Sequence, residues 1–275
     1  MEAKLFKKKK TGHLPKIVIP VHFAGQSCEM EQIYSLSKKY DFIAIEDACH
    51  ALGGSYKESK IGSCKFSDIT VFSFHPVKTI TTGEGGMVLT NNENLYQKLI
   101  RLRTHGITKN TEFTQGKVLG AWCYEQIELG FNYRLTDIQA ALGCSQMLRL
   151  NAFVERRRRL AKRYDALLKS LPLVLPYQHP DSNSAFHLYP VRLKLNEISK
   201  SREQVFDELR KAGIGVNVHY IPVHTQPFYQ RLGFKTGDFP VAEGYYQEAI
   251  SLPLYYDLTD DNQDFVISIA SKVLA

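Results

Sequence analysis

The segment Ser73-Phe-His-Pro-Val-Lys78 brings a lysine and a hydroxyl close together in the chain. Ser73 lies near the end of an apolar run, Ile69-Thr-Val-Phe-Ser-Phe74, and Lys78 follows it. This run has the length and composition of a buried strand. Burial lowers the pKa of a lysine, which gives an amine that can form a Schiff base with a carbonyl compound. Ser73 can offer its hydroxyl to a phosphate, and the glycines of residues 79–86 let the backbone turn sharply beside a ligand. A lone lysine after a strand is usually a surface residue, so this segment alone is only suggestive.

A second polar group, Glu46-Asp47-Ala-Cys-His50, ends an earlier apolar run. An acid at the carboxyl end of a strand can pair with a pyridinium nitrogen and keep it protonated, which makes the ring an electron sink. His50 can pack beside the same ring or hydrogen-bond to it. Taken singly, Asp47 would be a helix cap and His50 a structural histidine. An acid followed about thirty residues later by a serine and a lysine, at successive strand ends, is the arrangement that pyridoxal phosphate chemistry requires.

The elements that must position these residues alternate between strand and helix. Short apolar runs predict strands at residues 16–21, 42–47, 69–74 and 87–90. Apolar residues at helical spacing predict helices at residues 25–40 and 94–103, after a helix that Gly12 and Pro15 end. A strand, a helix and a strand at this spacing form a βαβ unit, which implies a parallel sheet with its ligands at the carboxyl ends of the strands.

The alternation then pauses at a polar loop over residues 104–124. One long helical stretch is predicted over residues 136–168, with Thr136 as its cap. Farther on, we expect strands and helices at residues 188–195, 201–212, 215–219 and 262–274. The chain is therefore expected to be an α/β protein, with a partial large domain over residues 1–150 and a small α+β domain over residues 151–275.

The composition is that of a globular protein, since 44% of the 275 residues are hydrophobic and 23% are charged. No apolar run approaches the roughly 20 residues that a membrane span needs, and residues 1–10 lack the apolar stretch of a secretory signal. Five dispersed cysteines without metal-ligand spacing argue against a disulfide framework and a metal site. We predict a cytoplasmic protein without a membrane partner or a metal.

The net charge of +7 gathers partly in two runs, Lys7 to Lys10 and Arg156 to Arg159. Such runs suit nucleic-acid binding, or else a solvated helix face and a frayed terminus. We favour the second interpretation and predict no nucleic-acid partner, because neither run has interleaved aromatic residues. A positive field also suits a phosphorylated cofactor and a diphosphate substrate.

Four strings resemble the sugar aminotransferases of the DegT/DnrJ/EryC/StrS family, at residues 21–25, 46–53, 72–86 and 130–143. The resemblance covers nearly the whole chain and implies the fold-type I architecture of aspartate aminotransferase, with pyridoxal 5'-phosphate as cofactor. Among its branches, the one that acts in pseudaminic acid biosynthesis is the most similar. That similarity implies an amino group moved from L-glutamate to a UDP-linked 4-keto-6-deoxy-N-acetyl hexose, on the way to flagellar or surface glycans.

The resemblance also implies roles for single residues. Lys78 matches the lysine that binds the cofactor aldehyde, and Asp47 matches the partner of the ring nitrogen, so both are expected to be catalytic. His50 matches a contact of the ring near its phenolic oxygen, and Ser73 matches a phosphate ligand. Asn132 matches a residue that reaches the phosphate of the neighbouring subunit's cofactor, which implies a homodimer with shared active sites. Candidate substrate contacts are His75, Arg134, His219 and Tyr220.

The sequence departs from the family in one respect. Family members extend farther at the N-terminus, by about a hundred residues that include a loop whose backbone amides bind the phosphate. We therefore expect a truncated large domain, and three hypotheses stay open: an active aminotransferase, an incomplete fragment that needs an N-terminal partner, and a sugar dehydratase with the same cofactor. Such dehydratases replace the cofactor-binding lysine with histidine, so Lys78 argues against the third.

Overall fold

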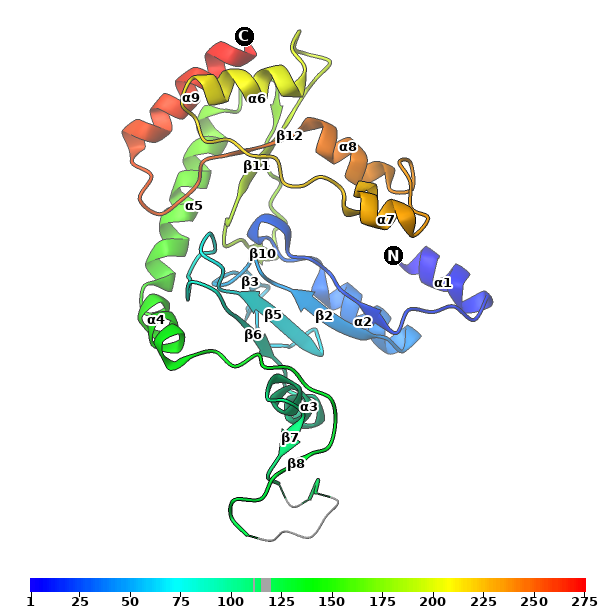
Figure 1. Cartoon of the computed structure of the whole chain (residues 1–275). Coiled ribbons are helices and arrows are strands. Elements are labelled where there is room, and N and C mark those ends of the chain that lie inside the picture. Colours follow the sequence, from blue (N-terminus) through cyan, green and yellow to red (C-terminus); the bar gives the residue numbers. More distant parts are fainter. Residues whose placement is uncertain (111, 115–119) are drawn as a thin grey trace. The chain divides into compact units, whose positions relative to one another are not determined.

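The computed structural model describes residues 1–110, 112–114 and 120–275 and divides the chain into two compact units (Figure 1). The first unit comprises Met1–His22, Cys28–Leu52 and Glu58–Arg149, and the second comprises Phe23–Ser27, Gly53–Lys57 and Leu150–Ala275. Part of the loop expected over residues 104–124, namely residues 111 and 115–119, lies outside the described residues. Within the described part, no helix combines the length and the apolar character needed to cross a bilayer.

A four-stranded sheet forms the centre of the first unit, in the order β1-β2-β5-β6. Its strands are β1 (Ile17–Val18), β2 (Ile43–Asp47), β5 (Ile69–Ser73) and β6 (Gly86–Leu89). The first three are parallel, whereas β6 runs antiparallel to β5. The helix α2 (Met30–Tyr40) connects β1 to β2, which confirms the βαβ unit that the sequence predicts.

The helices α1 (Glu2–Lys10) and α2 cover one face of this sheet. Leu5 of α1 packs with Tyr40, Phe42 and Ala44 in a buried cluster, and Val18 lies against it. Because side chains alternate along a strand, the paired residues Val18 of β1 and Ala44 of β2 both face this cluster. The other elements of the unit are β4 (Ser59–Lys60), α3 (Glu93–Arg103), β7 (Ile107–Thr108), β8 (Glu125–Gln126) and α4 (Asp137–Met147).

The long helix predicted over residues 136–168 is two helices, so this prediction was wrong in its extent. α4 ends at Met147, and α5 (Leu150–Leu167) begins three residues later in the second unit. Apolar residues keep their helical spacing through the break, which is why the pattern did not reveal it. The cap at Thr136 is confirmed: its hydroxyl accepts the backbone N–H of Gln139, and the side chain of Gln139 accepts the N–H of Thr136.

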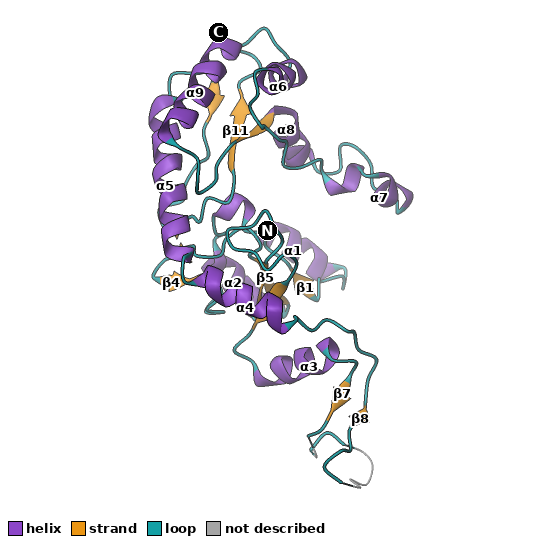
Figure 2. Cartoon of the chain, turned by 60° about the vertical axis from the view of Figure 1, so that its left-hand side comes forward, coloured by secondary structure: helices purple, strands orange, loops and turns teal. Residues whose placement is uncertain are grey.

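The second unit is an antiparallel sheet packed against helices (Figure 2). Its three strands, in the order β12-β11-β9, are β12 (Ala249–Leu252), β11 (Tyr189–Leu193) and β9 (Leu173–Val174). The larger helices are α5, α6 (Arg202–Lys211) and α9 (Asp260–Leu274), and they share a core with the sheet. Shorter elements are η1 (Phe23–Gly25), β3 (Ser55–Tyr56), β10 (Ser182–Asn183), η2 (Val223–Thr225), α7 (Pro227–Arg231) and α8 (Pro240–Glu248).

The strand predicted at residues 215–219 does not form. Its only ladder contact among the described residues is an isolated antiparallel bridge between Asn217 and Ser251. The Asn217 side chain then accepts the backbone N–H of Val218. A polar side chain that satisfies the next backbone donor replaces the ladder bond that would extend a strand.

The arginine run in α5 is not a solvated helix face, which corrects that interpretation. Arg157 is 7% exposed, and its guanidinium donates to three backbone carbonyls of the second unit. Arg156 pairs with Asp260 at 2.9 Å, whereas the neighbouring Arg159 is exposed. Helical spacing points adjacent residues in different directions, so one run of like charges divides between core and surface.

Candidate active site

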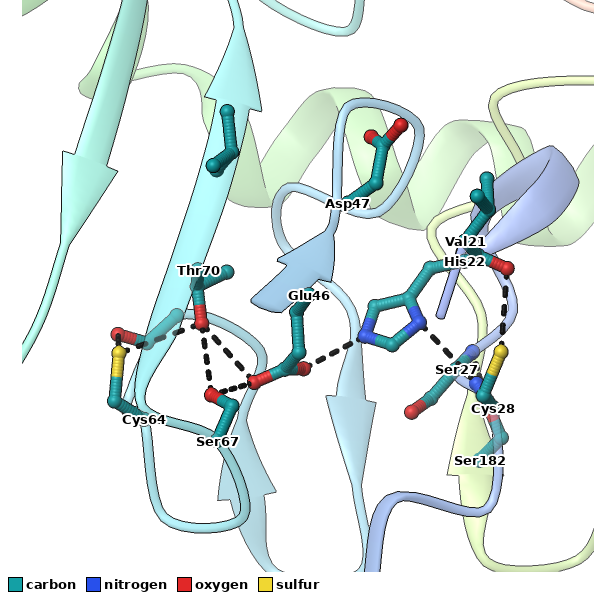
Figure 3. A network of polar contacts seen from close by, with 12 residues as sticks. Val21, His22, Ser27, Cys28, Glu46, Asp47, Cys64, Ser67, Thr70 and Ser182 are labelled. Atoms are coloured by element: carbon teal, nitrogen blue, oxygen red, sulfur yellow. Dashed lines mark hydrogen bonds and ion pairs between the residues drawn. The ribbon is translucent and has the colours of Figure 1, made fainter. Parts of the chain in front are cut away.

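Asp47 lies at the carboxyl end of β2 with its side chain directed away from that of Glu46 (Figure 3). The backbone there is fixed, because Asp47 N–H donates to the carbonyl of Pro20 and the His22 N–H donates to the carbonyl of Asp47, both at 2.9 Å. The Asp47 carboxylate accepts the backbone N–H of Cys49 at 3.1 Å. Residues 48–50 form a turn and not a helix, so Asp47 is not the helix cap that the sequence left open.

Lys78 ends a turn that follows β5, with its N–H donating to the carbonyl of His75 at 2.9 Å. Its side chain is half-buried, and burial lowers the pKa of the amine below its ordinary value. Interactions with Cys49 and with the negative charge of Asp47 act in the opposite direction and offset this only in part. Lys78 thus belongs to one site with Asp47 and Cys49, although these residues follow two different strands.

The loop after Lys78 folds back onto the end of β5. Phe74 donates its N–H to the carbonyl of Gly85 at 2.8 Å and accepts the N–H of Thr82 at 3.0 Å. At Gly86, a Cβ would lie 2.8 Å from the carbonyl oxygen of Phe72, closer than side chains tolerate. Gly86, one of the glycines expected to let the backbone turn sharply, therefore allows this loop to lie against β5, the strand that carries Ser73.

Ser73 and His75 flank the same turn. The Ser73 hydroxyl is half-buried and accepts the backbone N–H of His75 at 3.3 Å. His75 is exposed, and its Nε2 lies 3.8 Å from a carboxylate oxygen of Glu84. His50 is buried in the turn that follows Asp47. The structure therefore gathers the candidates from residues 47–50 and 73–78 at neighbouring strand ends of one sheet.

Asn132 and Arg134 lie on an exposed segment before α4. Arg134 donates to the side-chain oxygen of Asn132 through Nε at 3.3 Å and Nη2 at 3.2 Å. The first turn of α4, which follows this segment, touches the loop after Lys78, because the side-chain amide of Gln139 donates to the carbonyl of Glu84 at 3.0 Å. These two candidates are held together by their own contact and stand near the loop of the site.

His219 and Tyr220 belong to the second unit. The Nδ1 of His219 lies 2.8 Å from the hydroxyl of Ser251, and Tyr220 is half exposed with its ring edge-on to Phe23. Their expected role as substrate contacts stays a prediction.

Cys49 is a site residue that the sequence analysis missed. Its backbone N–H donates to the Asp47 carboxylate at 3.1 Å, and its thiol lies 4.0 Å from the carbonyl oxygen of Val71. Burial, followed by the proximity of the Asp47 carboxylate, raises the pKa of the thiol to about 12, so the thiol stays protonated. The signal in the sequence is its position two residues after the acid, within a turn that brings the side chains together.

A buried polar network lies on the opposite face of β2 (Figure 3). Glu46 is 5% exposed and accepts His22 Nε2 at 2.7 Å, the Thr70 hydroxyl at 3.0 Å and the Ser67 hydroxyl. Burial would raise the pKa of Glu46, but the hydrogen bonds and the charge of His22 outweigh it and hold the pKa below its ordinary value. The network ties the chain after β1 to β2 and β5, and so fixes the strand end on which Asp47 stands.

The side chains at this site fit pyridoxal phosphate. Lys78 supplies an amine whose pKa burial lowers, Asp47 supplies a carboxylate at the end of a parallel strand, and Ser73 supplies a hydroxyl on the neighbouring strand. These are the groups that the aldehyde, the ring nitrogen and the phosphate require.

Comparison with known proteins agrees with this chemistry. The sequence profile of the DegT/DnrJ/EryC1/StrS aminotransferase family matches residues 3–271. The chain belongs to this family. Its fold is that of the pyridoxal-phosphate-dependent aminotransferases, and the family's members are enzymes that use this cofactor.

Individual relatives are similar over almost the whole chain. A Campylobacter jejuni protein named UDP-4-amino-4,6-dideoxy-N-acetyl-beta-L-altrosamine transaminase is 40% identical over 92% of this chain and 65% of its own length. The structure of Helicobacter pylori PseC, an aminotransferase of pseudaminic acid biosynthesis, superposes with a TM-score of 0.85 at 33% identity, over 95% of this chain and 67% of that one. A Streptococcus pneumoniae chain solved in its PLP form gives a TM-score of 0.82 at 31% identity, over 94% and 69%. The chain thus spans about two thirds of the length of its relatives.

Proposed function

We propose that this protein moves an amino group from L-glutamate to a UDP-linked 4-keto-6-deoxy-N-acetyl hexose, with pyridoxal phosphate held at Lys78. The observation that carries the proposal is that Asp47 and Ser73 end neighbouring parallel strands and that the half-buried Lys78 lies in the turn after the second of them, where burial lowers its pKa. The choice of substrate is supported by the name of the Campylobacter jejuni relative and by the pathway of PseC. Entry of the product into flagellar glycans and a cytoplasmic location stay predictions.

When bound, pyridoxal phosphate supplies an electron sink that stabilises negative charge on the carbon bonded to the migrating nitrogen. Lys78 would hold the cofactor through its aldehyde group, and the free Lys78 amine would act as the base that removes a proton from that carbon and as the acid that later gives the proton back. Its lowered pKa increases the fraction of neutral amine near pH 7, which is the form that accepts a proton. Asp47 would keep a proton on the ring nitrogen, and the backbone N–H of Cys49 orients the Asp47 carboxylate.

The remaining candidate residues are proposed to bind and orient the cofactor or the substrate. Ser73 is proposed to hold the cofactor phosphate and His50 to contact the ring near its phenolic oxygen. Substrate contacts are proposed for His75, Arg134, His219 and Tyr220. In this scheme the large cofactor-binding domain corresponds to residues 1–150 and the small domain to residues 151–275.

A homodimer with shared active sites is part of the proposal. No residue of α4 is buried, although the helix carries Ile138, which is 84% exposed. Just before it, the rings of Phe131 and Tyr133 stack 4.8 Å apart on the surface. Exposed apolar groups of this kind favour association, and a second copy on this surface would bring Asn132 to the partner's cofactor phosphate.

A second candidate function is that of an incomplete enzyme that needs a further polypeptide. It is favoured by the length of the relatives, of which this chain spans about two thirds. The dehydratase hypothesis is weaker, because Lys78 is present and interacts with Asp47.

The first test is cofactor trapping. The purified chain is incubated with pyridoxal phosphate, reduced with borohydride and digested, and the modified lysine is identified by mass spectrometry. We expect a visible absorption band and a label on Lys78, lost in Lys78→Ala and kept in Lys98→Ala, which alters an exposed lysine of α3. Glutamate and the keto-sugar are then supplied and the amino sugar is measured.

The outcomes separate the two candidates. A label on Lys78 with amino-sugar formation supports the complete enzyme. A folded chain without the label supports the incomplete one. A label on other lysines that Lys78→Ala does not reduce would overturn the assignment of the site.

A further inference from the structure

The segment that carries His219 and Tyr220 forms no strand in the part of the chain that the structure describes. We call residues 219–224 the strap. The last ladder contact before the strap is the bridge between Asn217 and Ser251, and the strap then runs into η2. Its conformation therefore depends chiefly on side-chain contacts.

Two such contacts hold the strap, one at each end. At its start, Nδ1 of His219 lies 2.8 Å from the hydroxyl of Ser251 on β12. At its end, Nε2 of His224 lies 2.7 Å from a carboxylate oxygen of Glu243 on α8. Between these two contacts, the side chain of Tyr220 is half exposed. The strap thus crosses the surface of the second unit between two fixed points and leaves Tyr220 accessible.

The carboxylate of Glu243 binds more than the strap. It accepts the backbone N–H of Gly237 through both oxygens, at 2.8 and 2.9 Å, and the N–H of Phe239 at 3.3 Å. The ring of Phe239 in turn lies 4.7 Å from the ring of His224, measured between their centres. The side chains of His224 and Glu243 are only 8% and 17% exposed. Glu243 therefore joins the end of the strap to the loop that precedes α8.

The residue types of the strap suit a sugar better than an amino acid. The strap contains neither lysine nor arginine, which are the residues that bind the carboxylates of glutamate most strongly. A sugar presents hydroxyl groups and apolar C–H faces, and an aromatic ring with a polar tip, such as Tyr220, can contact both. Of the two proposed substrates, the keto-sugar is the one that the strap would contact.

We propose that Glu243 is a positioning residue for the keto-sugar: by holding His224 it fixes the strap, and the fixed strap presents Tyr220 to the substrate. The carboxylate acts through His224 and through the loop before α8, where it accepts backbone donors. This inference deepens the proposed function and rests on it, because His219 and Tyr220 are substrate contacts only in that proposal.

The physical basis is the order of the strap before the substrate binds. A segment that the substrate must order binds it more weakly, because ordering costs conformational entropy. Glu243→Ala would release the strap at His224 and would leave its contact with Ser251 in place. The proton-transfer group Lys78 belongs to the first unit, whereas Glu243 and the strap belong to the second. The change should therefore weaken sugar binding more than it slows the chemistry.

The first measurement is amide hydrogen exchange, followed by NMR, on the 275-residue chain without cofactor. The N–H groups of Thr225 and Gln226 report on the strap, because they donate to the carbonyls of Pro222 and Val223 at 2.9 and 3.1 Å. In Glu243→Ala these two amides should exchange at least about tenfold faster, since the strap loses its hydrogen bond to a carboxylate.

Two further variants serve as controls. Glu243→Gln keeps a side-chain oxygen that can accept the same donors, so its exchange should stay close to that of the parent. Glu248→Ala removes a carboxylate from the same helix, where it pairs with the partly exposed Arg192 at 3.1 Å, and should leave the exchange unchanged. Circular dichroism establishes that each variant is folded. Unchanged exchange of both amides in a folded Glu243→Ala would overturn the proposal.

The second measurement separates positioning from stability. In steady-state transamination, Glu243→Ala should raise KM for the keto-sugar at least about tenfold and change kcat and KM for glutamate by less than about twofold. Glu243→Gln should restore KM for the keto-sugar to near the parent value. A loss that falls on kcat, or a rise shared equally by both KM values, would overturn the assignment of Glu243 as a positioning residue for the sugar.

Failure of the proposed function gives a different result. A parent chain that does not transaminate refutes the complete enzyme, and the hydrogen-exchange measurement still decides whether Glu243 fixes the strap. In that case, the affinity for UDP-N-acetylglucosamine, measured by isothermal titration calorimetry, replaces KM. We expect it to be at least about tenfold weaker in Glu243→Ala than in the parent and in Glu248→Ala. Equal affinities, or no binding to the parent chain, would overturn the proposal.

Discussion

Removing the buried carboxylate of Glu46 should strongly destabilise the first unit. The change Glu46→Ala leaves the ring of His22, which is 0% exposed, without its partner at 2.7 Å, and it leaves the hydroxyls of Ser67 and Thr70 without their acceptor. Breaking a buried ion pair by removing one partner costs about 3–5 kcal/mol. The control Glu2→Ala removes an exposed carboxylate 2.8 Å from Lys39, and exposed pairs contribute little.

The assay is urea unfolding at pH 7, followed by circular dichroism, with hydrogen exchange to assign the transition to the first unit. We expect a lower urea midpoint for Glu46→Ala than for the parent, and an unchanged midpoint for Glu2→Ala. The effect also depends on pH: the pKa of Glu46 lies below its ordinary value of 4.5, so its stabilisation is present above pH 4.5 and is lost as the pH falls through the folded-state pKa. The difference between the parent and Glu46→Gln should therefore shrink on acidification. Equal midpoints for Glu46→Ala and the parent at pH 7 would refute the network as a source of stability.

Two further predictions concern other charged residues. Arg157→Met should destabilise the second unit by at least about 2 kcal/mol, because three carbonyls lose a buried donor. Arg159→Met alters an exposed arginine and should change stability by less than about 0.5 kcal/mol. Equal urea midpoints for the two variants would contradict this prediction. Asp47→Asn should lower the pKa of Lys78 further, because the Asp47 charge raises it in the parent. The NMR titration of ¹³C-methylated Lys78 measures this pKa, and an unchanged pKa in the variant would show that the two groups do not interact.

The sequence alone was sufficient to predict those strands and helices whose residue pattern is local. Four strands of the first unit and the helix between β1 and β2 were predicted near their observed positions, because apolar runs and helical spacing persist over several residues. The side chains 47, 73 and 78 were predicted to meet because parallel strands end at one edge of a sheet.

Contacts across the chain were not predictable in this way. The carboxylate of Glu46 accepts hydrogen bonds from Ser67 and Thr70, which lie more than twenty residues away in the sequence. Nothing in the local pattern of residues 67–70 indicates that they are its partners. Cys49 was only one of five dispersed cysteines in the sequence, and its contact with Asp47 depends on the turn after β2. The arginines of α5 resembled a surface run until the tertiary fold surrounded one of them with carbonyls. Each of these depends on distant segments whose positions a single sequence does not specify.

The alternation of side chains along β2 separates stability from chemistry at this site. Glu46 points to one face of the sheet, where its hydrogen bonds hold three segments together, and Asp47 points to the other face, where its charge acts on Lys78. A cofactor that binds only the folded state stabilises it by an amount that rises with the logarithm of the cofactor concentration. The urea midpoint of the first unit should therefore rise as pyridoxal phosphate is added, and a midpoint that the cofactor leaves unchanged would show that this site does not bind it.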